Sequence, residues 1–184
     1  MRAPDWTLKN TDSSSHEDVK HLRRAVAFSR QGKLEEAINE ISKAQSARPK
    51  DAYLQDLKAE LYMRHKKFDR AAKEYQKASD LDGSNALILA GYGRALLASN
   101  QTNKALSVLK TSRQKDFRNI RMLRDLAVAY SKTGQNGMAS LITAERFALQ
   151  GKTKDANIHA RRALDNLPRG SPGWQSAEDI LDIK

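Results

Sequence analysis

The chain has 184 residues, a net charge of +11 and no cysteine. The lack of cysteine excludes disulfides, thiol catalysis and cysteine-ligated zinc. The positive charge favours acidic partners or an anionic surface, and no apolar run in the sequence approaches the roughly 18 residues that a membrane-spanning helix needs.

The segment 1–14 shows no period and is expected to form a flexible leader. Within it, Trp6 is either part of a disordered segment or an anchor that folds onto the first helix. From residue 15 onward, small residues recur at a fixed spacing, which defines one repeat. The three clearest sets are Ala25, Ala37 and Ala44, then Ala59, Ala71 and Ala78, then Gly93, Ala105 and Ser112.

Small residues at these positions let two helix axes approach closely. The spacing between equivalent positions is about 34 residues, and a helix, turn and helix of that period is the tetratricopeptide (TPR) repeat. The chain resembles TPR proteins from Ser15 to about Lys184. We therefore predict an all-α fold, a right-handed TPR superhelical solenoid of about ten antiparallel helices over residues 15–184. The helix pairs are predicted near 15–47, 52–81, 86–115 and 120–150, followed by a helix at 153–166 and a C-terminal capping helix at 172–183.

A fourth set begins at Ala127, one repeat after Gly93, and the period breaks there. The next marker after Ala127 is Ala144, which lies only half a repeat further along the chain. The helix near 138–150 is therefore predicted to serve twice, closing the fourth pair and opening a fifth. Ser171 and Pro172 suit the start of a last helix, which would cover the open end of the core.

The predicted binding surface is the face of each first helix that lines the inner curve of the solenoid. This groove mixes aliphatic patches with arginines and becomes more basic toward the fourth pair, which suits an extended peptide or protein segment with acidic character, or an acidic terminus. For any single charge the alternative is that it is merely solvated. The candidate partner-binding residues are Tyr53, Asp56, Glu60, Arg64, Arg94, Leu97, Arg121, Arg124 and Val128.

Nothing in the sequence argues for catalysis, a metal or a cofactor in this chain. The stretch from His16 to His21 resembles the zinc motif HExxH, but its histidines are five positions apart. That spacing turns the second histidine about 140° around a helix, so one zinc cannot take both. Gly91 and Gly93 fall inside a predicted helix, so they do not form a phosphate-binding loop.

The densest run of positive charge, from Lys110 to Arg124, is the kind of patch that binds nucleic acid. Phe117 is the only aromatic residue in it that could stack on a base, so RNA binding is a distant alternative to a solvated basic edge. A further possibility is a homo-oligomer, because an uncapped first helix pair would favour pairing between chains.

Two stretches carry a narrower resemblance. Residues 51–63 (DAYLQDLKAELYM) and residues 144–180, which include the turn PRGSPGW, are similar to the TPR tail of BepA-like periplasmic zinc metallopeptidases. In that family an N-terminal peptidase domain carries HExxH, and the tail holds substrates or envelope partners during outer-membrane protein quality control.

The resemblance implies that this chain is the partner-binding C-terminal region of such an enzyme, in the periplasm, with zinc and the active site in a preceding domain. The alternative is a stand-alone TPR adaptor without a peptidase, for which a cytoplasmic location is expected.

Overall fold

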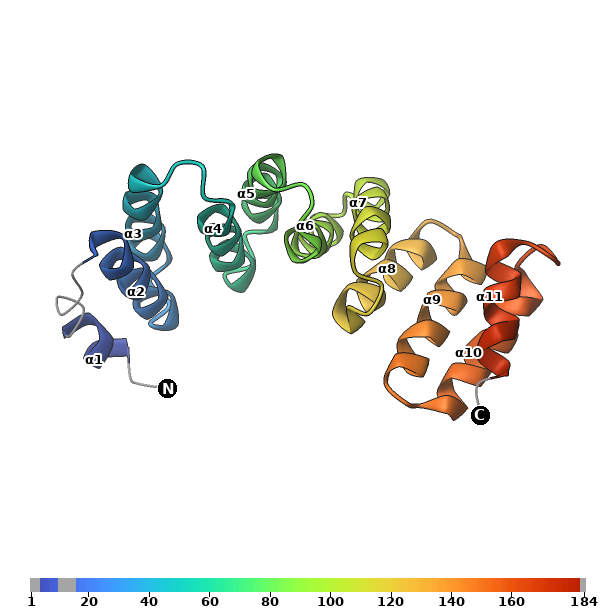
Figure 1. Ribbon diagram of the computed structural model, residues 1–184. Helices are drawn as coiled ribbons and strands as arrows, with labels where there is room; N and C mark the ends of the chain where they lie inside the picture. The colour runs from blue at the N-terminus through green and yellow to red at the C-terminus, as the bar shows by residue number, and fades with distance from the viewer. Residues whose placement is uncertain (1–3, 10–15, 183–184) are drawn as a thin grey trace. The chain divides into compact units, whose positions relative to one another are not determined.

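The computed structural model describes residues 4–9 and 16–182. Within these ranges every regular element is a helix, so the predicted all-α fold class is confirmed, with eleven helices in place of about ten. They are labelled in Figure 1. In chain order they are α1 (Pro4–Lys9), α2 (Glu17–Arg30), α3 (Leu34–Ala47), α4 (Ala52–Arg64), α5 (Phe68–Leu81), α6 (Ala86–Ala98), α7 (Thr102–Lys115), α8 (Ile120–Lys132), α9 (Asn136–Leu149), α10 (Thr153–Asn166) and α11 (Pro172–Leu181).

The additional helix, α1, lies in the leader, where no helix was predicted. It packs against α2, and Gln31 Nε2 donates a hydrogen bond to the Asp5 carboxylate. Trp6 stays 44% exposed, so this packing does not bury it. The rest of the leader, residues 1–3 and 10–14, lies outside the described residues, as do residues 15, 183 and 184.

The contacts between helices divide the chain into two compact units, and the boundary along the sequence lies between Ser84 and Asn85. In the first unit α2 packs against α3, α3 against α4, and α4 against α5. The small residues of the repeat lie at these contacts, and Ala25, Ala37 and Ala59 have no exposed surface. Ile41 and Leu61 fill the remaining space with partly buried leucines and Phe28 around them.

The backbone conformation of the turns within the helix pairs recurs with the same period. The φ angle is positive at Gly32, Lys66, Asn100 and Gly134, each of which lies one repeat after the one before. In each case the next residue's N–H donates back to a carbonyl five positions earlier, as from Lys67 N to Tyr62 O over 2.9 Å. Such bonds satisfy carbonyls that a helix end would leave unpaired.

The starts of three first helices follow the same period. Asp51, Asn85 and Asn119, spaced by one repeat, accept hydrogen bonds from backbone N–H groups of α4, α6 and α8. Side-chain oxygens at this position replace the bonding partners that the first turn of a helix lacks. The helix boundaries therefore follow from side chains that are visible in the sequence.

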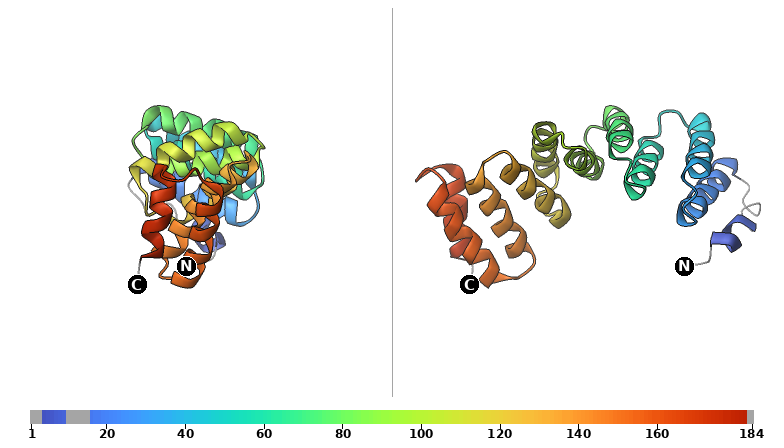
Figure 2. Two further views of the ribbon diagram at one scale, coloured as in Figure 1. Left: turned by 90° about the vertical axis from the view of Figure 1, so that its right-hand side faces the viewer. Right: turned by 180° about the vertical axis from the view of Figure 1, so that it is seen from behind.

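In the second unit α6 packs against α7, and α9 packs against both α8 and α10. Figures 1 and 2 show α9 between these two helices. This is the double use of one helix that the half-repeat spacing predicts. The backbone shows the same half-repeat spacing, since the next positive φ after Gly134 is at Gly151, half a repeat further along the chain.

Close packing holds α9 and α10 together. A Cβ on Gly137 would stand 2.7 Å from the carbonyl oxygen of Asn166, so only glycine fits there. At the end of the unit, Ser171 Oγ accepts from Trp174 N at 3.3 Å and begins α11, which adds Ala177 and Ile180 to the core around Ala160. None of the described helices is long and apolar enough to cross a membrane.

Candidate partner-binding site

The first unit presents its candidate residues on α4. Tyr53 and Arg64 are exposed, whereas Asp56 and Glu60 are partly buried one turn apart. The Tyr75 hydroxyl, from α5, donates to Glu60 Oε1 over 2.7 Å. Glu60 is therefore held by the helix behind it.

Asp56 has an unusual carboxyl group. Burial, and next the neighbouring charge of Glu60, raise the pKa of Asp56 from 3.8 to about 6. Two carboxyl groups side by side disfavour a further negative charge near them. The face of α4 is thus a poor match for the acidic segment that the sequence predicts.

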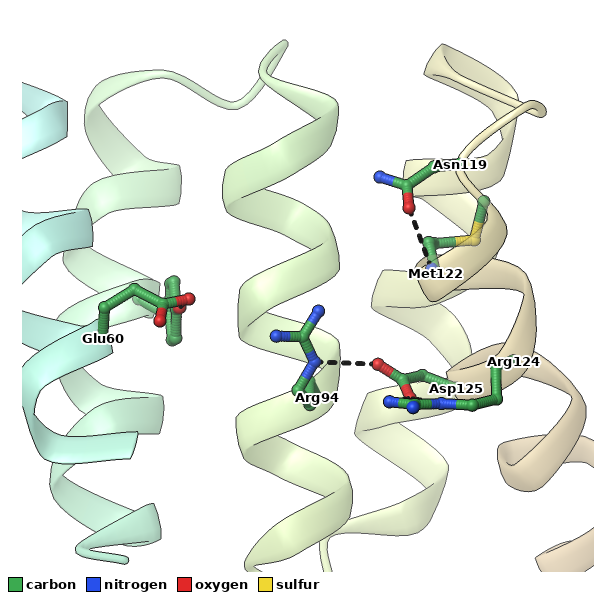
Figure 3. A network of polar contacts seen from close by, with 7 residues as sticks. Glu60, Arg94, Asn119, Met122, Arg124 and Asp125 are labelled. Atoms are coloured by element: carbon green, nitrogen blue, oxygen red, sulfur yellow. Dashed lines mark hydrogen bonds and ion pairs between the residues drawn. The ribbon is translucent and has the colours of Figure 1, made fainter. Parts of the chain in front are cut away.

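In the second unit, α6 carries Arg94 and the partly buried Leu97, and α8 carries Arg121, Arg124 and Val128. Arg94 Nε donates to Asp125 Oδ2 over 2.9 Å. Arg124 donates to Asp125 Oδ1 from Nε at 3.1 Å and from Nη2 at 2.9 Å. Figure 3 shows the two guanidinium groups converging on this one carboxylate.

Asp125 is the residue that sequence reasoning missed. Its side chain is only 8% exposed, and a buried carboxylate is stable only when it is paired. The available signal was an acidic residue within the largely apolar run from Met122 to Ala129. Two positive charges share one negative charge here, so Arg94 and Arg124 offer a ligand less net positive charge than two unpaired arginines would.

A hollow lies between α8, α9 and α10, with a volume of about 390 Å³. Of the nine candidate residues, Arg124 and Val128 line it, and the other seven do not. Sequence reasoning considered the first helices of the second, third and fourth pairs, α4, α6 and α8, and therefore missed the contributions of α9 and α10. Those include Arg146 from α9 and His159 and Arg162 from α10. We call this hollow the α8–α10 cavity.

Stacked side chains order one wall of the α8–α10 cavity. The guanidinium of Arg146 lies 4.3 Å from the centre of the Phe147 ring. The His159 ring stacks on the same Phe147 with 5.5 Å between centroids and 27° between planes. Burial lowers the pKa of His159, and the charges of Arg162 and Arg146 lower it further against the opposing effect of Asp155.

The α8–α10 cavity is electrostatically unbalanced. No carboxylate is among its lining residues in the described part of the chain. Among the ion pairs of the described residues, Arg124 has Asp125, but none involves Arg146 or Arg162. A site where two guanidinium groups lack carboxylate partners is suited to a negatively charged ligand.

The basic run from Lys110 to Arg124 is partly used internally. Arg113 Nη2 forms an ion pair with Glu145 Oε1 at 2.6 Å, and the Arg118 guanidinium lies 5.5 Å from the centre of the Phe117 ring. With Arg124 also paired, this run offers fewer unpaired charges than its sequence suggests.

The zinc-like stretch has a structural role at its second histidine. His21 Nδ1 lies 2.8 Å from Glu40 Oε2, and this contact joins α2 to α3. Within residues 4–9 and 16–182, no three histidine, aspartate or glutamate side chains are grouped in a way that could hold a metal.

Two family models match the sequence, and both describe a tetratricopeptide repeat. One covers residues 62–127 and the other residues 21–51, which together are more than half of the chain. The chain belongs to the tetratricopeptide repeat proteins. The predicted TPR solenoid is therefore confirmed at the level of family and fold.

Solved TPR structures share the fold at low identity. MamA 41-end from Desulfovibrio magneticus RS-1 has a TM-score of 0.71 and 14% identity over 80% of this TPR chain and 86% of its own. Another MamA structure has a TM-score of 0.70 and 13% identity, covering 91% and 93% of the two chains. TTC0263, a thermophilic TPR protein in Thermus thermophilus, has a TM-score of 0.59 and 16% identity, covering 89% and 98%.

No curated protein matches the sequence. The comparisons supply no link to a peptidase, so the BepA-like relationship rests on the sequence resemblance alone.

Proposed function

We propose that this TPR chain is a protein-binding scaffold and that its second unit holds an acidic segment of the partner. The TPR family implies protein partners. The observation that most supports an acidic segment is the α8–α10 cavity, where Arg146 and Arg162 lack carboxylate partners among the described residues.

The distribution of charge supports the same choice of unit. Residues 85–184 contain 16 lysines and arginines against 8 aspartates and glutamates, a net charge of +8. Residues 1–84 contain 17 against 14, a net charge of +3. A field of one sign over one unit raises the rate at which oppositely charged segments associate with it.

Fluorescence anisotropy tests this function on the whole chain. The probe is a labelled twelve-residue peptide of alternating aspartate and serine with both termini blocked, and its control replaces every aspartate by asparagine. The acidic peptide should bind saturably and more weakly at high salt, because exposed charges are screened, while the neutral peptide should not bind. Absence of saturable binding, or tighter binding of single-stranded RNA, would contradict the proposal.

A narrower function follows from the resemblance of residues 51–63 and 144–180 to BepA-like tails. In it, the chain is the partner-binding region of a periplasmic zinc metallopeptidase, and zinc is bound in a separate domain. The stand-alone adaptor is better supported, since the family models and the similar solved structures are TPR proteins and none of them supplies a link to a peptidase.

The gene distinguishes these two versions. An HExxH motif in frame upstream of residue 1 would favour the peptidase, and an upstream stop codon would favour the adaptor. Fractionation of cells should then place the protein in the periplasm in the first case and in the cytoplasm in the second.

A further inference from the structure

The α8–α10 cavity combines an elongated floor of small residues with arginines from separate helices. We infer that it anchors the partner by the carboxylate side chains of an extended acidic segment, which Arg146 and Arg162 bind. This inference deepens the proposed function and rests on it.

The floor of the α8–α10 cavity is a single face of α9. Asn136, Ala139, Ser140 and Thr143 line it, and Arg146 follows at the rim. The steps from Asn136 to Ala139 or Ser140, and from these to Thr143, are three or four positions, which keeps the residues on one side of the helix. From Asn136 to Arg146 the helix rises by about 15 Å, because each residue adds about 1.5 Å. An extended chain advances about 3.3 Å per residue, so about four or five residues of a ligand fit along this floor.

The small side chains keep this floor open. Ala139, Ser140 and Thr143 stand where longer residues would fill the space between α8 and α10. The Thr143 hydroxyl already donates to the Ala139 carbonyl over 2.8 Å, so its proton is used in a hydrogen bond within α9. The ligand-binding charge therefore comes from the rim and not from the floor.

The rim supplies the two arginines. Arg146 is held against Phe147, which is itself stacked on His159. A side chain that is already positioned loses less conformational entropy when it binds. Arg162 lies on α10, one turn after His159 on the same face.

α10 reaches this site because α9 packs against both α8 and α10. Residues of all three helices line the α8–α10 cavity. The groove positions of the regular first helices end with α8, so they do not include Arg162.

The arrangement favours side-chain carboxylates over one terminal carboxylate. On an extended segment, side chains two positions apart point the same way and are about 7 Å apart. Two arginines on separate helices, beside a floor of about 15 Å, suit a ligand that carries more than one carboxylate. A terminal carboxylate is a single group at one end and would leave the rest of the floor unused.

The test compares two double variants that remove the same charge. Arg146→Gln with Arg162→Gln removes both rim charges, while Lys104→Gln with Arg161→Gln removes two exposed charges of the same unit outside the cavity. The probe is the blocked aspartate–serine peptide with the whole chain. The rim variant should weaken binding at least about tenfold, because charge-assisted pairs are lost, and the control variant less than about threefold, because only screened long-range attraction is lost.

Two further arms locate the site and identify the group bound. Ser140→Phe fills the floor without changing charge and should also reduce affinity at least about tenfold. A neutral asparagine–serine peptide with a free C-terminal carboxylate should bind much more weakly than the blocked acidic peptide.

Each result supports or overturns the inference. Equal weakening by the rim and control variants would overturn the cavity as the anchor while leaving acidic-segment binding intact. Preference for the peptide with the free terminus would overturn the choice of side-chain carboxylates. If the acidic peptide does not bind the unaltered chain, the proposed function fails together with the inference. Circular dichroism checks that every variant keeps its helical content.

Discussion

Arg94 on α6 and Asp125 on α8 are joined by a hydrogen-bonded ion pair of 2.9 Å, although they lie 31 positions apart in sequence. The ion pair joins α6 and α8, two first helices of the second unit, which also contact each other directly. Because Arg124 binds the other oxygen of the same carboxylate, Asp125 governs both the stability of this face and the charge that it shows to a ligand.

Asp125→Asn should therefore change stability and binding in opposite directions. It removes the negative charge that two guanidinium groups share, which should lower the free energy of unfolding by about 1–3 kcal/mol. It also releases Arg94 and Arg124, so the affinity for the blocked acidic peptide should rise about twofold to fivefold. Urea denaturation and fluorescence anisotropy measure the two effects.

The matched control for this variant is Asp165→Asn, which removes the same charge from an exposed position on α10. Its unfolding free energy should stay within about 0.5 kcal/mol of that of the unaltered chain. Weaker peptide binding by Asp125→Asn, with helical content retained, would show that the carboxylate positions the arginines for the ligand and does not compete with it.

The turns allow a test of the backbone itself. Lys66 has a φ of 58° at the position where Gly32 and Gly134 also have positive φ. A positive φ destabilises the folded state by about 1–2 kcal/mol when the residue has a Cβ. Glycine avoids this strain, but its greater freedom in the unfolded chain lowers the free energy of unfolding by about 0.5–1 kcal/mol. Lys66→Gly should therefore raise the free energy of unfolding by about 0.5–1 kcal/mol, measured by urea denaturation.

Gly32→Lys supplies the reciprocal experiment in the same unit. A Cβ at Gly32 meets no atom within 4 Å, so any loss of stability reflects the backbone and not a clash. It should destabilise the chain by a similar amount. If both substitutions change stability in the same direction, positive φ is not what distinguishes these positions.

The fold could be predicted from sequence because it depends on spacing. Small residues such as Ala59 and Ala71 mark helix contacts, and Asn85 and Asn119 mark helix starts, whatever the rest of the chain does. Helix α1 was missed because its short segment has no repeat to compare with.

The candidate site could be predicted only in part. Arg124 and Val128 are visible as exposed positions on a first helix, and both line the α8–α10 cavity. That Arg94 is already paired could not be seen, because its partner Asp125 lies on another helix. His159 and Arg162 were missed for another reason. The half-repeat spacing at α9 is visible in the sequence, but it does not predict which face of α10 lines the cavity.

Asp56 should make stability depend on pH. Its pKa is about 6 in the folded chain against an ordinary value of 3.8, so the folded state holds this proton more tightly. The resulting stabilisation is fully present below about pH 4 and is lost as pH rises through about 6. Asp56→Asn should therefore raise the free energy of unfolding by about 1–3 kcal/mol at pH 7 and have little effect at pH 4.

Urea denaturation at pH 4, 5, 6, 7 and 8 measures this effect. Asp69→Asn, an exposed position on α5 of the same unit, is the control and should not show the same pH-dependent gain. An equal gain for Asp56→Asn at pH 4 and pH 7 would mean that packing, and not titration, accounts for it.

His159 should couple peptide binding to protonation. Burial, Arg162 and Arg146 lower its pKa, against Asp155, so the imidazole is mainly neutral at pH 7.5. An acidic segment in the α8–α10 cavity would favour the charged imidazolium, so binding should take up a proton. The affinity for the blocked acidic peptide should rise about twofold to fivefold between pH 7.5 and 5.5, where the aspartates of the peptide stay ionised.

His159→Gln should flatten this pH dependence while the binding at pH 7.5 changes little. Asp56 titrates in the same range, so both proteins in the comparison should carry Asp56→Asn, which leaves the histidine as the difference between them. His65→Gln, at the end of α4 in the first unit, is the control and should keep the full effect. Affinity that rises equally at low pH without His159 would place the proton uptake elsewhere on the chain, and affinity that falls would mean that the imidazole does not face the bound carboxylates.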